Sequence, residues 1–523
     1  MPVELKSFLQ GMWVTGQGDP IFLYNPTTEE KIAYTSTEGL NFLGALDFAR
    51  KQGGKALRKL HFKERATLLR KMADAIHHKR EELIEVAIQN SGNTRKDGKF
   101  DIDGATSVFS AYAEIGEQLG ERYFLAEDEL YQLGRNPRFV GQHILTPRQG
   151  VALHINAFNF PAWGFAEKAA TALLSGVPVI AKPATSTALL TYRIFELIVD
   201  LLPLGALSLI CGPVGNLLDH LMAQDVVAFT GSSETGAKIR GHPNLIRNNI
   251  RVNIEADSLN ATILGPDVES DSETFKLFLM EVVREMTSKA GQKCTAIRRI
   301  FVPESRSDEV QEQLIERLKE ITLGDPQLKE VQMGPLATLD QLQAAKNGLK
   351  HLQKNAQIIY GNPETFEVKG VPSKKGYFFP PILLRANPAS APEVHHCEVF
   401  GPVSTILPYP DQDLESLVEW VQLGGGSLVS SLFSDDKKFL QELVLQLAPF
   451  HGRILMGTEK VVELSTGHGT VMPQLVHGGP GRAGGGEELG GLRGLHFYFQ
   501  RTAIQGYRPH LESFFGTKPS NNQ

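Results

Sequence analysis

Cysteine, long apolar runs and a large surplus of either charge are all scarce in this chain. Only 3 of its 523 residues are cysteine, which excludes a disulfide scaffold. No apolar run approaches the roughly 20 residues that span a bilayer, and residues 1–13 lack the apolar core of a signal peptide. The net charge of −6 gives no reason to expect binding to nucleic acid or to a membrane surface. These absences favour a cytoplasmic protein.

The chain does have the length and patterning of an enzyme with more than one domain. With 523 residues, 41% of them hydrophobic, it can form more than one sizeable core. After Gly150, short apolar strands alternate with helices; the strands are expected at 151–155, 178–181, 207–210, 226–229 and 251–254. This alternation predicts an α/β fold with a parallel sheet covered on both faces. Ligands bind such sheets at the carboxyl ends of the strands.

A second strand and helix series follows Asn260 and predicts a second α/β domain. Its strands are expected at 299–302, 358–360, 378–384 and 403–409, and its long helix at 272–290. Before the first sheet, residues 61–91 place apolar side chains at helical spacing.

Half of the residues in the segment His477–Gly494 are glycine. We expect an irregular but ordered loop, because the aromatic, strand-like stretch 495–499 follows it at once. Residues 139–146 and 495–506 could pair as an arm that reaches a neighbouring subunit.

Three residues are candidates for chemistry. Cys294 follows a predicted helix beside Gly291 and Lys293, and nearby positive charge lowers a thiol pKa. Glu255 ends a strand, where a carboxylate can act as a base. Asn159 precedes a helix, where its amide can donate to an oxyanion. Taken alone, each also fits a structural role: a small buried residue, a surface acid and a helix N-cap.

Candidate cofactor residues follow two other strands of the same sheet. The segment Phe229–Gly236 opens a helix, and its Gly231, Ser232 and Gly236 suit a phosphate at a helix N-terminus, although it is not the G-x-G-x-x-G fingerprint. Lys182 could reach ribose hydroxyls or a phosphate; the alternative is an exposed lysine at a strand end.

Together these segments resemble one family, the aldehyde dehydrogenase superfamily, over nearly the whole chain. The segments that carry the resemblance are Phe158–Pro161, Lys182–Ala184, Phe229–Ser232, Glu255, Gly291–Cys294 and Glu398–Pro402.

The resemblance implies a role for each site residue. Cys294 resembles the nucleophile that forms a thiohemiacetal, and Asn159 with the Cys294 N–H resembles the oxyanion hole. Glu255 resembles the base that activates water to hydrolyse the thioester. Lys168 matches a family lysine near the thiol, Glu398 the residue that holds the nicotinamide ribose, and Phe400 one that packs against that end of the cofactor.

The resemblance also implies an aldehyde dehydrogenase fold. A Rossmann-like cofactor-binding domain would comprise residues 1–127 and 149–256, and an α/β catalytic domain residues 257–476. Residues 128–148 and 495–515 would form a β-arm for oligomerisation, giving a homodimer or a higher homo-oligomer.

Two positions depart from the common family pattern. Many NAD-preferring members have a glutamate where this chain has Thr185. A neutral hydroxyl does not repel a 2′-phosphate and Lys182 can attract one, so we expect NADP as the cofactor, with NAD as the alternative. The usual Glu-Leu-Gly-Gly-Lys stretch is altered to Glu255-Ala256-Asp257-Ser258-Leu259, without its glycines.

These departures resemble one branch of the family, which oxidises semialdehydes formed by ring opening of aromatic CoA thioesters. Members from phenylacetate breakdown carry a C-terminal hydratase domain, whereas this chain ends at Gln523 without the length for one. It therefore resembles the stand-alone enzymes of benzoate breakdown, with a CoA-linked aldehyde as substrate.

Rival functions are an acylating dehydrogenase, in which free CoA takes the acyl group, and oxidation of simple aldehydes. Glu255 favours hydrolysis. A metal-dependent hydrolase built on His395-His396-Cys397-Glu398 is disfavoured, because neighbours on an extended segment face opposite sides. We therefore expect no metal.

Overall fold

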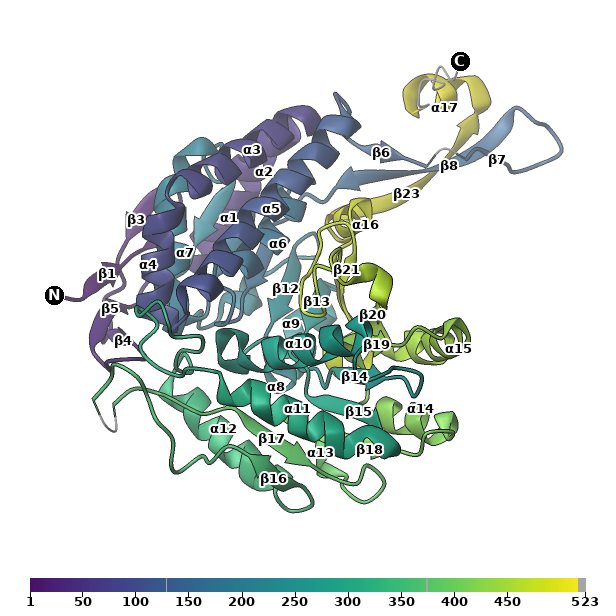
Figure 1. The fold of residues 1–523 in the computed structure, drawn as a ribbon. Helices are drawn as coiled ribbons and strands as arrows, with labels where there is room; N and C mark the ends of the chain where they lie inside the picture. Colours follow the sequence, from purple (N-terminus) through teal and green to yellow (C-terminus); the bar gives the residue numbers. More distant parts are fainter. Residues whose placement is uncertain (128, 373–374, 516–523) are drawn as a thin grey trace.

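Two seven-stranded sheets and a projecting β-ribbon organise the chain (Figure 1). This computed structural model describes residues 1–127, 129–372 and 375–515. Residue 128 of the expected arm, residues 373–374 of the expected second α/β unit and the chain end at Gln523 lie outside the described residues.

The first sheet has the order β13-β12-β9-β10-β11-β2-β3. The five strands from β13 to β11 are parallel, and β2 and β3 add an antiparallel hairpin from the N-terminus at the other side. The five parallel strands confirm the alternation expected after Gly150. The strand bounds are β2 (Ser7–Leu9), β3 (Met12–Val14), β9 (Ala152–Ile155), β10 (Val179–Lys182), β11 (Leu207–Leu209), β12 (Val226–Thr230) and β13 (Arg251–Glu255).

Helices cover this sheet and bury the largest apolar core. The helical expectation for residues 61–91 is confirmed, with a break at Lys79. Helix α3 begins with a capping box, in which the His61 side chain and Glu64 satisfy each other's backbone N–H. The helices are α1 (Phe42–Phe48), α2 (Gly54–Arg58), α3 (Phe62–His78), α4 (Arg80–Ser91), α5 (Arg95–Leu119), α6 (Trp163–Leu174), α7 (Ala188–Ile198), α8 (Ser233–Arg240) and α9 (Pro243–Arg247).

The second sheet has the order β16-β17-β18-β15-β14-β19-β20 and is parallel except for β16 at its edge. Three of its strands, β14, β19 and β20, are absent from the strands expected from sequence. The strands are β14 (Ala261–Leu264), β15 (Arg299–Pro303), β16 (Gln357–Tyr360), β17 (Ile382–Arg385), β18 (Val403–Tyr409), β19 (Ser427–Phe433) and β20 (His451–Gly457). Its helices are α10 (Glu273–Thr287), α11 (Ser307–Lys319), α12 (Leu339–Leu352), α13 (Glu393–His396), α14 (Leu414–Gln422) and α15 (Lys437–Leu447).

Two small sheets complete the body. One has the order β1-β5-β4, from β1 (Val3–Leu5), β4 (Ile21–Tyr24) and β5 (Lys31–Thr35). The other pairs β21 (Val476–Gly478) with β22 (Glu487–Leu489), inside the glycine-rich segment. That segment is ordered, as expected. The strand expected at 495–499 is wrong: α16 (Leu492–Leu495) runs into a 3-10 turn over His496–Tyr498, and the strand begins at Phe499.

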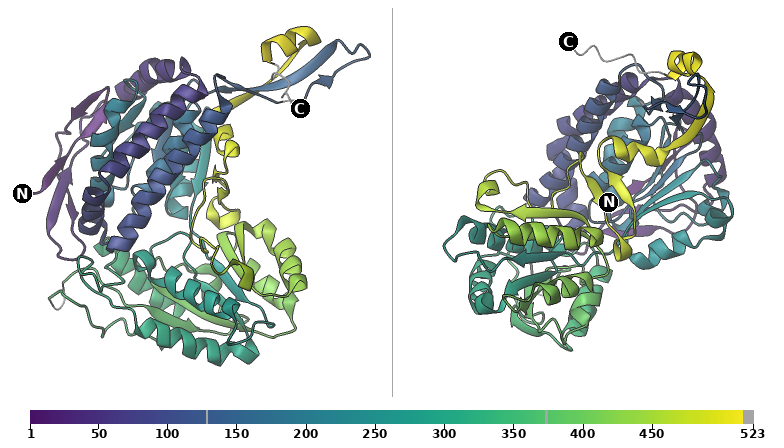
Figure 2. Two further views of the ribbon diagram at one scale, coloured as in Figure 1. Left: turned by 45° about the horizontal axis from the view of Figure 1, so that its top comes forward. Right: turned by 90° about the vertical axis from the view of Figure 1, so that its right-hand side faces the viewer.

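A ribbon projects from the body (Figures 1 and 2) and confirms the expected pairing for residues 499–506, whereas residues 495–498 of the expected stretch do not pair. Strand β8 (Phe139–Pro147) pairs antiparallel with β23 (Phe499–Tyr507), from Phe499 opposite Pro147 to Tyr507 opposite Phe139. Strands β6 (Leu125–Ala126) and β7 (Tyr131–Gln132) also pair with β8, and α17 (Arg508–Phe515) follows β23. Among the described residues, no helix is long and apolar enough to cross a membrane.

Candidate active site

The carboxyl ends of the parallel strands place two of the candidate residues, Lys182 and Glu255, at one edge of the first sheet. Lys182 and Phe229 both pair with Ile155, and Thr230 pairs with Glu255, so β9, β10, β12 and β13 end within one residue of the same level. Loops that follow these strands therefore converge at this edge, as expected for a parallel sheet.

Cys294 lies on a loop that leaves α10 through a strained turn. Helix α10 ends at Thr287, and Lys289 and Ala290 both have φ of 53°, a conformation that costs non-glycine residues energy. Gly291 has φ of 68°, and a Cβ there would lie 2.4 Å from the carbonyl oxygen of Gly401. Glycine is thus required where the Cys294 loop approaches the Glu398–Pro402 segment.

Two polar side chains hold this loop, and sequence reasoning missed both. The amide of Asn260 donates to the carbonyl oxygens of Cys294 and Ala296, each at 2.8 Å. The buried Arg298 guanidinium donates to the carbonyl oxygens of Gly401 and Gly291, at 2.7 and 3.0 Å. Arg298 therefore ties the Cys294 loop to the segment that carries Glu398.

Two cavities meet at Cys294. A narrow one of about 40 Å³ continues towards Phe100, Trp163 and Val471, and a wider one of about 470 Å³ extends towards Lys182 and Glu398. The residues that line both are Asn156, Ala157, Asn159, Thr230, Glu255 and Cys294. All three predicted catalytic residues thus lie at the junction.

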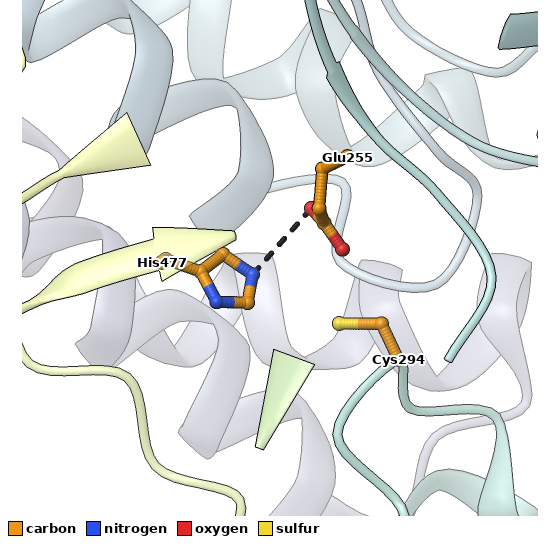
Figure 3. A group of neighbouring side chains, drawn as sticks. All are labelled: Glu255, Cys294 and His477. Carbon is orange, nitrogen blue, oxygen red and sulfur yellow. Dashed lines mark ion pairs between the residues drawn. The ribbon is translucent and has the colours of Figure 1, made fainter. Parts of the chain in front are cut away.

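Cys294, Glu255 and His477 converge from three parts of the chain (Figure 3). One polar atom of each lies within 4.8 Å of the others. Burial raises the pKa of the Cys294 thiol well above its usual value, and the nearby carboxylates Glu255 and Glu167 raise it further. The resting thiol is therefore protonated at neutral pH.

Glu255 is ionised and paired. Its Oε2 lies 3.4 Å from His477 Nε2 and accepts a hydrogen bond of 3.2 Å from Thr230 Oγ1. Burial opposes ionisation of Glu255, but His477 and Lys168 outweigh it and lower the pKa to about 2. The same pairing raises the pKa of His477 against the effect of its own burial. The sequence analysis gave His477 no role. The feature that could have pointed to it is its place at the start of an ordered glycine-rich loop.

Lys168 lies beneath this pair, which agrees with its expected place near the thiol. Its Nζ donates to Thr230 Oγ1 at 2.6 Å and to Glu488 Oε2 at 3.0 Å. Burial would lower the pKa of Lys168, but Glu488 and Glu167 raise it, so the ammonium stays charged. Glu167 lines the narrow cavity, and burial raises its pKa to about 7. Glu167 and Glu488 were also missed from the sequence.

Asn159 is buried beside Cys294. One N–H of its amide donates to the carbonyl oxygen of Gln292 at 3.1 Å, which fixes the amide plane. The side chain lines both cavities, so its second N–H is available to an oxygen bound at Cys294.

Five of the seven predicted cofactor residues line the wider cavity: Lys182, Gly231, Ser232, Glu398 and Phe400. Thr185 and Gly236 do not line it. Thr185 opens a 3-10 turn just after Ala184, which does line it. A Cβ at Gly236 would lie 3.0 Å from Ile254, so this glycine serves the packing of α8 on β13.

Glu398 is held from two sides. Its Oε2 accepts from the Ser258 N–H at 3.0 Å, and its Oε1 lies 3.4 Å from Arg298. Burial raises the pKa of Glu398 to about 7 although Arg298 opposes this. The Phe400 ring packs edge-on against Phe158 at 5.7 Å. A carboxyl and an aromatic ring in the lining of a 470 Å³ cavity fit a ribose and a flat heterocycle.

The site's polar groups do not favour a metal ion. Cys294, Glu255 and His477 offer ligand types that zinc accepts, and they lie close together. However, Glu255 Oε2 lies 3.4 Å from His477 Nε2, so the carboxylate and the imidazole are already paired with each other. The segment His395–Glu398, considered above for a metal-dependent hydrolase, was expected to be extended. This expectation is wrong for His395 and His396, which lie in helix α13. His395 lies 3.2 Å from the Arg299 guanidinium, which would repel a cation there.

Comparison with known proteins identifies the family. Residues 13–504 match the aldehyde dehydrogenase family. The chain belongs to that family. It therefore oxidises aldehydes and uses NAD or NADP, as the family does. The family of dehydrogenases and its mixed α/β fold, expected from the motifs, are confirmed.

Three of these dehydrogenases illustrate the range of similarity. A 3,4-dehydroadipyl-CoA semialdehyde dehydrogenase from Aromatoleum evansii is 43% identical over 91% of this chain and 93% of its own. A betaine aldehyde dehydrogenase from Bacillus subtilis is 26% identical over 98% of this chain and 99% of its own. A crystal structure of a Staphylococcus aureus betaine aldehyde dehydrogenase variant with NAD+ matches with a TM-score of 0.83 and 25% identity, covering 97% of this chain and 98% of that one.

Proposed function

We propose that this aldehyde dehydrogenase uses NADP to oxidise a CoA-linked semialdehyde to the carboxylic acid in aerobic benzoate degradation. The substrate would be of the 3,4-dehydroadipyl-CoA semialdehyde type, supported by 43% identity to a relative of that name. The chemistry rests on one observation: the two cavities meet at a thiol flanked by an ionised carboxylate and a fixed amide.

The first step is attack of Cys294 Sγ on the aldehyde carbon. The thiol gives up its proton to solvent as the carbon–sulfur bond forms, which leaves Glu255 ionised for the later hydrolysis. The carbonyl oxygen becomes an oxyanion, to which the Asn159 amide and the Cys294 N–H donate. The product of this step is a thiohemiacetal on Cys294.

A bound nicotinamide cofactor supplies the acceptor for the hydride that leaves the substrate carbon. Lys182, Ser232, Glu398 and Phe400 would hold that cofactor in the wider cavity. We propose NADP over NAD because Thr185 carries no negative charge and Lys182 lines the cavity.

Hydrolysis completes the reaction. The acyl group is then a thioester of Cys294, and Glu255 activates a water molecule that attacks the acyl carbon. Water supplies the oxygen of the acid, and the thiol regains a proton. Glu255 is ionised across the neutral range, as a general base must be before it takes a proton.

We further propose that residues 1–127 and 149–256 form the cofactor-binding domain and residues 257–476 the catalytic domain of a cytoplasmic enzyme. The arm, residues 128–148 and 495–515, would join subunits into a homodimer or a higher oligomer. Five large apolar or aromatic side chains exposed on the arm support this: Tyr131, Leu133, Phe139, Tyr507 and Phe514.

The test is NADP reduction with 3,4-dehydroadipyl-CoA semialdehyde, a free semialdehyde and a simple aliphatic aldehyde, each with and without free CoA. We expect the CoA-linked substrate to be preferred, the acid to form without free CoA, and NADP to be favoured over NAD. Obligatory consumption of free CoA would establish the acylating alternative. Equal efficiency with the simple aldehyde would contradict the substrate proposal.

A further inference from the structure

Beyond the narrow cavity at Cys294 lie two further cavities that are joined to it by shared lining residues. Phe100, Trp163 and Val471 line both the narrow cavity and one of about 520 Å³. Lys96, Lys99 and Arg284 line both that cavity and an outer groove of about 1150 Å³. The three cavities therefore form a row, here called the path, from Cys294 past Trp163 to the groove between α4, α5, α10 and α11.

Close packing at Gly104 keeps the inner part of this path narrow. A Cβ at Gly104, in the middle of α5, would lie 2.0 Å from the Trp163 ring. The absence of a side chain lets Trp163 lie against α5 beside Phe100, which gives the path an apolar, aromatic wall. Such a wall suits an unbranched chain rather than a charged group.

The outer groove is rich in positively charged side chains. Its charged lining residues are the bases Arg95, Lys96, Lys99, Arg284, Arg317 and Lys329 and the acids Glu85, Asp97 and Glu320. Arg95 pairs with Glu85 and Arg284 with Glu281, so these two charges are already compensated. Among the described residues, Lys96, Lys99, Arg317 and Lys329 form no ion pair.

Two details add to the positive character of the groove. The Nε of Arg317 is buried without a hydrogen-bond partner within the described part of the chain. Such a donor is costly to leave unpaired, which indicates a missing acceptor. Lys96 and Lys99 lie in the first turns of the 25-residue helix α5, where the helix dipole also favours an anion.

We propose that this groove binds the phosphorylated nucleotide end of a CoA thioester, while its pantetheine arm follows the path past Trp163 to Cys294. Lys96, Lys99, Arg317 and Lys329 supply the phosphate contacts. This assignment rests on the proposed CoA-linked substrate and adds the residues that recognise CoA.

The test compares one semialdehyde as its CoA thioester and as its pantetheine thioester, which lacks all phosphates. The variant Lys96→Glu/Lys99→Glu should lower kcat/KM for the CoA thioester about tenfold or more, mainly through KM, because charge-assisted phosphate contacts are lost. The same variant should leave kcat/KM for the pantetheine thioester unchanged. A second variant, Arg317→Gln, should likewise lower kcat/KM for the CoA thioester and not for the pantetheine thioester.

Lys350→Glu/Lys354→Glu is the matched control, since it makes the same charge change on and just after α12, away from the groove. It should behave like the wild type. Desulfo-CoA should inhibit oxidation of a simple aldehyde competitively in the wild type but weakly in Lys96→Glu/Lys99→Glu, and pantetheine should not inhibit.

The outcomes separate the two proposals. A wild-type preference for the CoA thioester over the pantetheine thioester that both groove variants retain would overturn the groove assignment and leave the substrate proposal intact. Equal use of the two thioesters would also overturn the groove. Thioesters used no better than simple aldehydes, with no inhibition by desulfo-CoA, would overturn both.

Discussion

Replacing Glu255 with glutamine should make Cys294 more reactive towards an alkylating reagent, not less. After burial, the charge of Glu255 is the largest cause that raises the pKa of the Cys294 thiol. Glutamine keeps the size of the side chain but removes that charge. Because the thiolate is the nucleophile, a lower thiol pKa gives faster alkylation at a fixed neutral pH.

The size of the effect follows from the distance. The two polar atoms lie within 4.8 Å. A unit charge at that distance raises the free energy of a thiolate by about 0.9 kcal/mol in a water-like dielectric and about 3.5 kcal/mol at an effective dielectric of 20. The thiol pKa should therefore fall, and alkylation near pH 7 should accelerate about 4-fold to about 300-fold.

The assay is the rate of iodoacetamide modification from pH 6 to pH 10 without cofactor. Cys294→Ala gives the background from Cys397, while Cys211 is fully buried. Glu255→Asp is the matched control, because it keeps the negative charge and should keep the high pH midpoint of the alkylation rate. Slower alkylation in Glu255→Gln than in the wild type, or an unchanged midpoint, would refute the electrostatic reasoning and show that Glu255 activates the resting thiol as a base.

Three other substitutions test the site. Lys168→Met leaves the buried Glu488 unpaired and should lower the free energy of unfolding by about 3–5 kcal/mol in urea titrations, with Lys168→Met/Glu488→Met recovering part of the loss. His477→Phe should flatten the pH dependence of the free energy of unfolding. In the wild type the Glu255–His477 pair stabilises the fold most between about pH 4.5 and 6.5. The contribution of Glu255 is lost as the pH falls towards 2, and that of His477 is lost as the pH rises through its raised pKa. An unchanged stability profile would contradict the ion pair. Thr185→Glu should lower the ratio of kcat/KM for NADP to that for NAD about fivefold or more through repulsion of the 2′-phosphate, and an unchanged ratio would remove Thr185 from cofactor selection.

The sequence predicted the first sheet well because its parallel strands are short apolar runs between helices. The strands missed in the second sheet show the limit of that signal. In β19, Ser427, Ser430 and Ser431 are fully buried, which hydropathy does not predict. Ser427 and Ser431 satisfy their hydroxyls across the sheet, on the Leu259 carbonyl oxygen and on Thr262.

The stretch 495–499 shows a different limit. Its aromatic residues favour a strand, yet a short apolar run fits a helical turn equally well. The choice depends on tertiary contacts: Tyr498 is buried with its hydroxyl 3.1 Å from the His154 ring. Nothing local in the sequence encodes that contact.

Within the site, the sequence indicated candidates next to strands and helices but not the charged groups that shift their pKa values. Cys294, Glu255 and Asn159 were candidates from their places next to strands and helices, and their predicted roles came from the family resemblance. His477 and Glu488 reach the site from the glycine-rich segment, and Glu167 from the middle of α6. Their roles depend on pairing over long sequence distances, which local patterns do not record.

The balance of charge around Cys294 explains how a thiol proposed as the nucleophile can be stable at rest. Three carboxyl groups, Glu255, Glu167 and Glu488, face two cations, Lys168 and His477, so the surroundings disfavour a thiolate at rest. A protonated thiol resists oxidation, since the thiolate is the species that oxidants attack. Attack on an aldehyde moves the negative charge from sulfur to the carbonyl oxygen, where the Asn159 amide can receive it. The site therefore penalises charge on the free thiol and accepts it on the bound substrate.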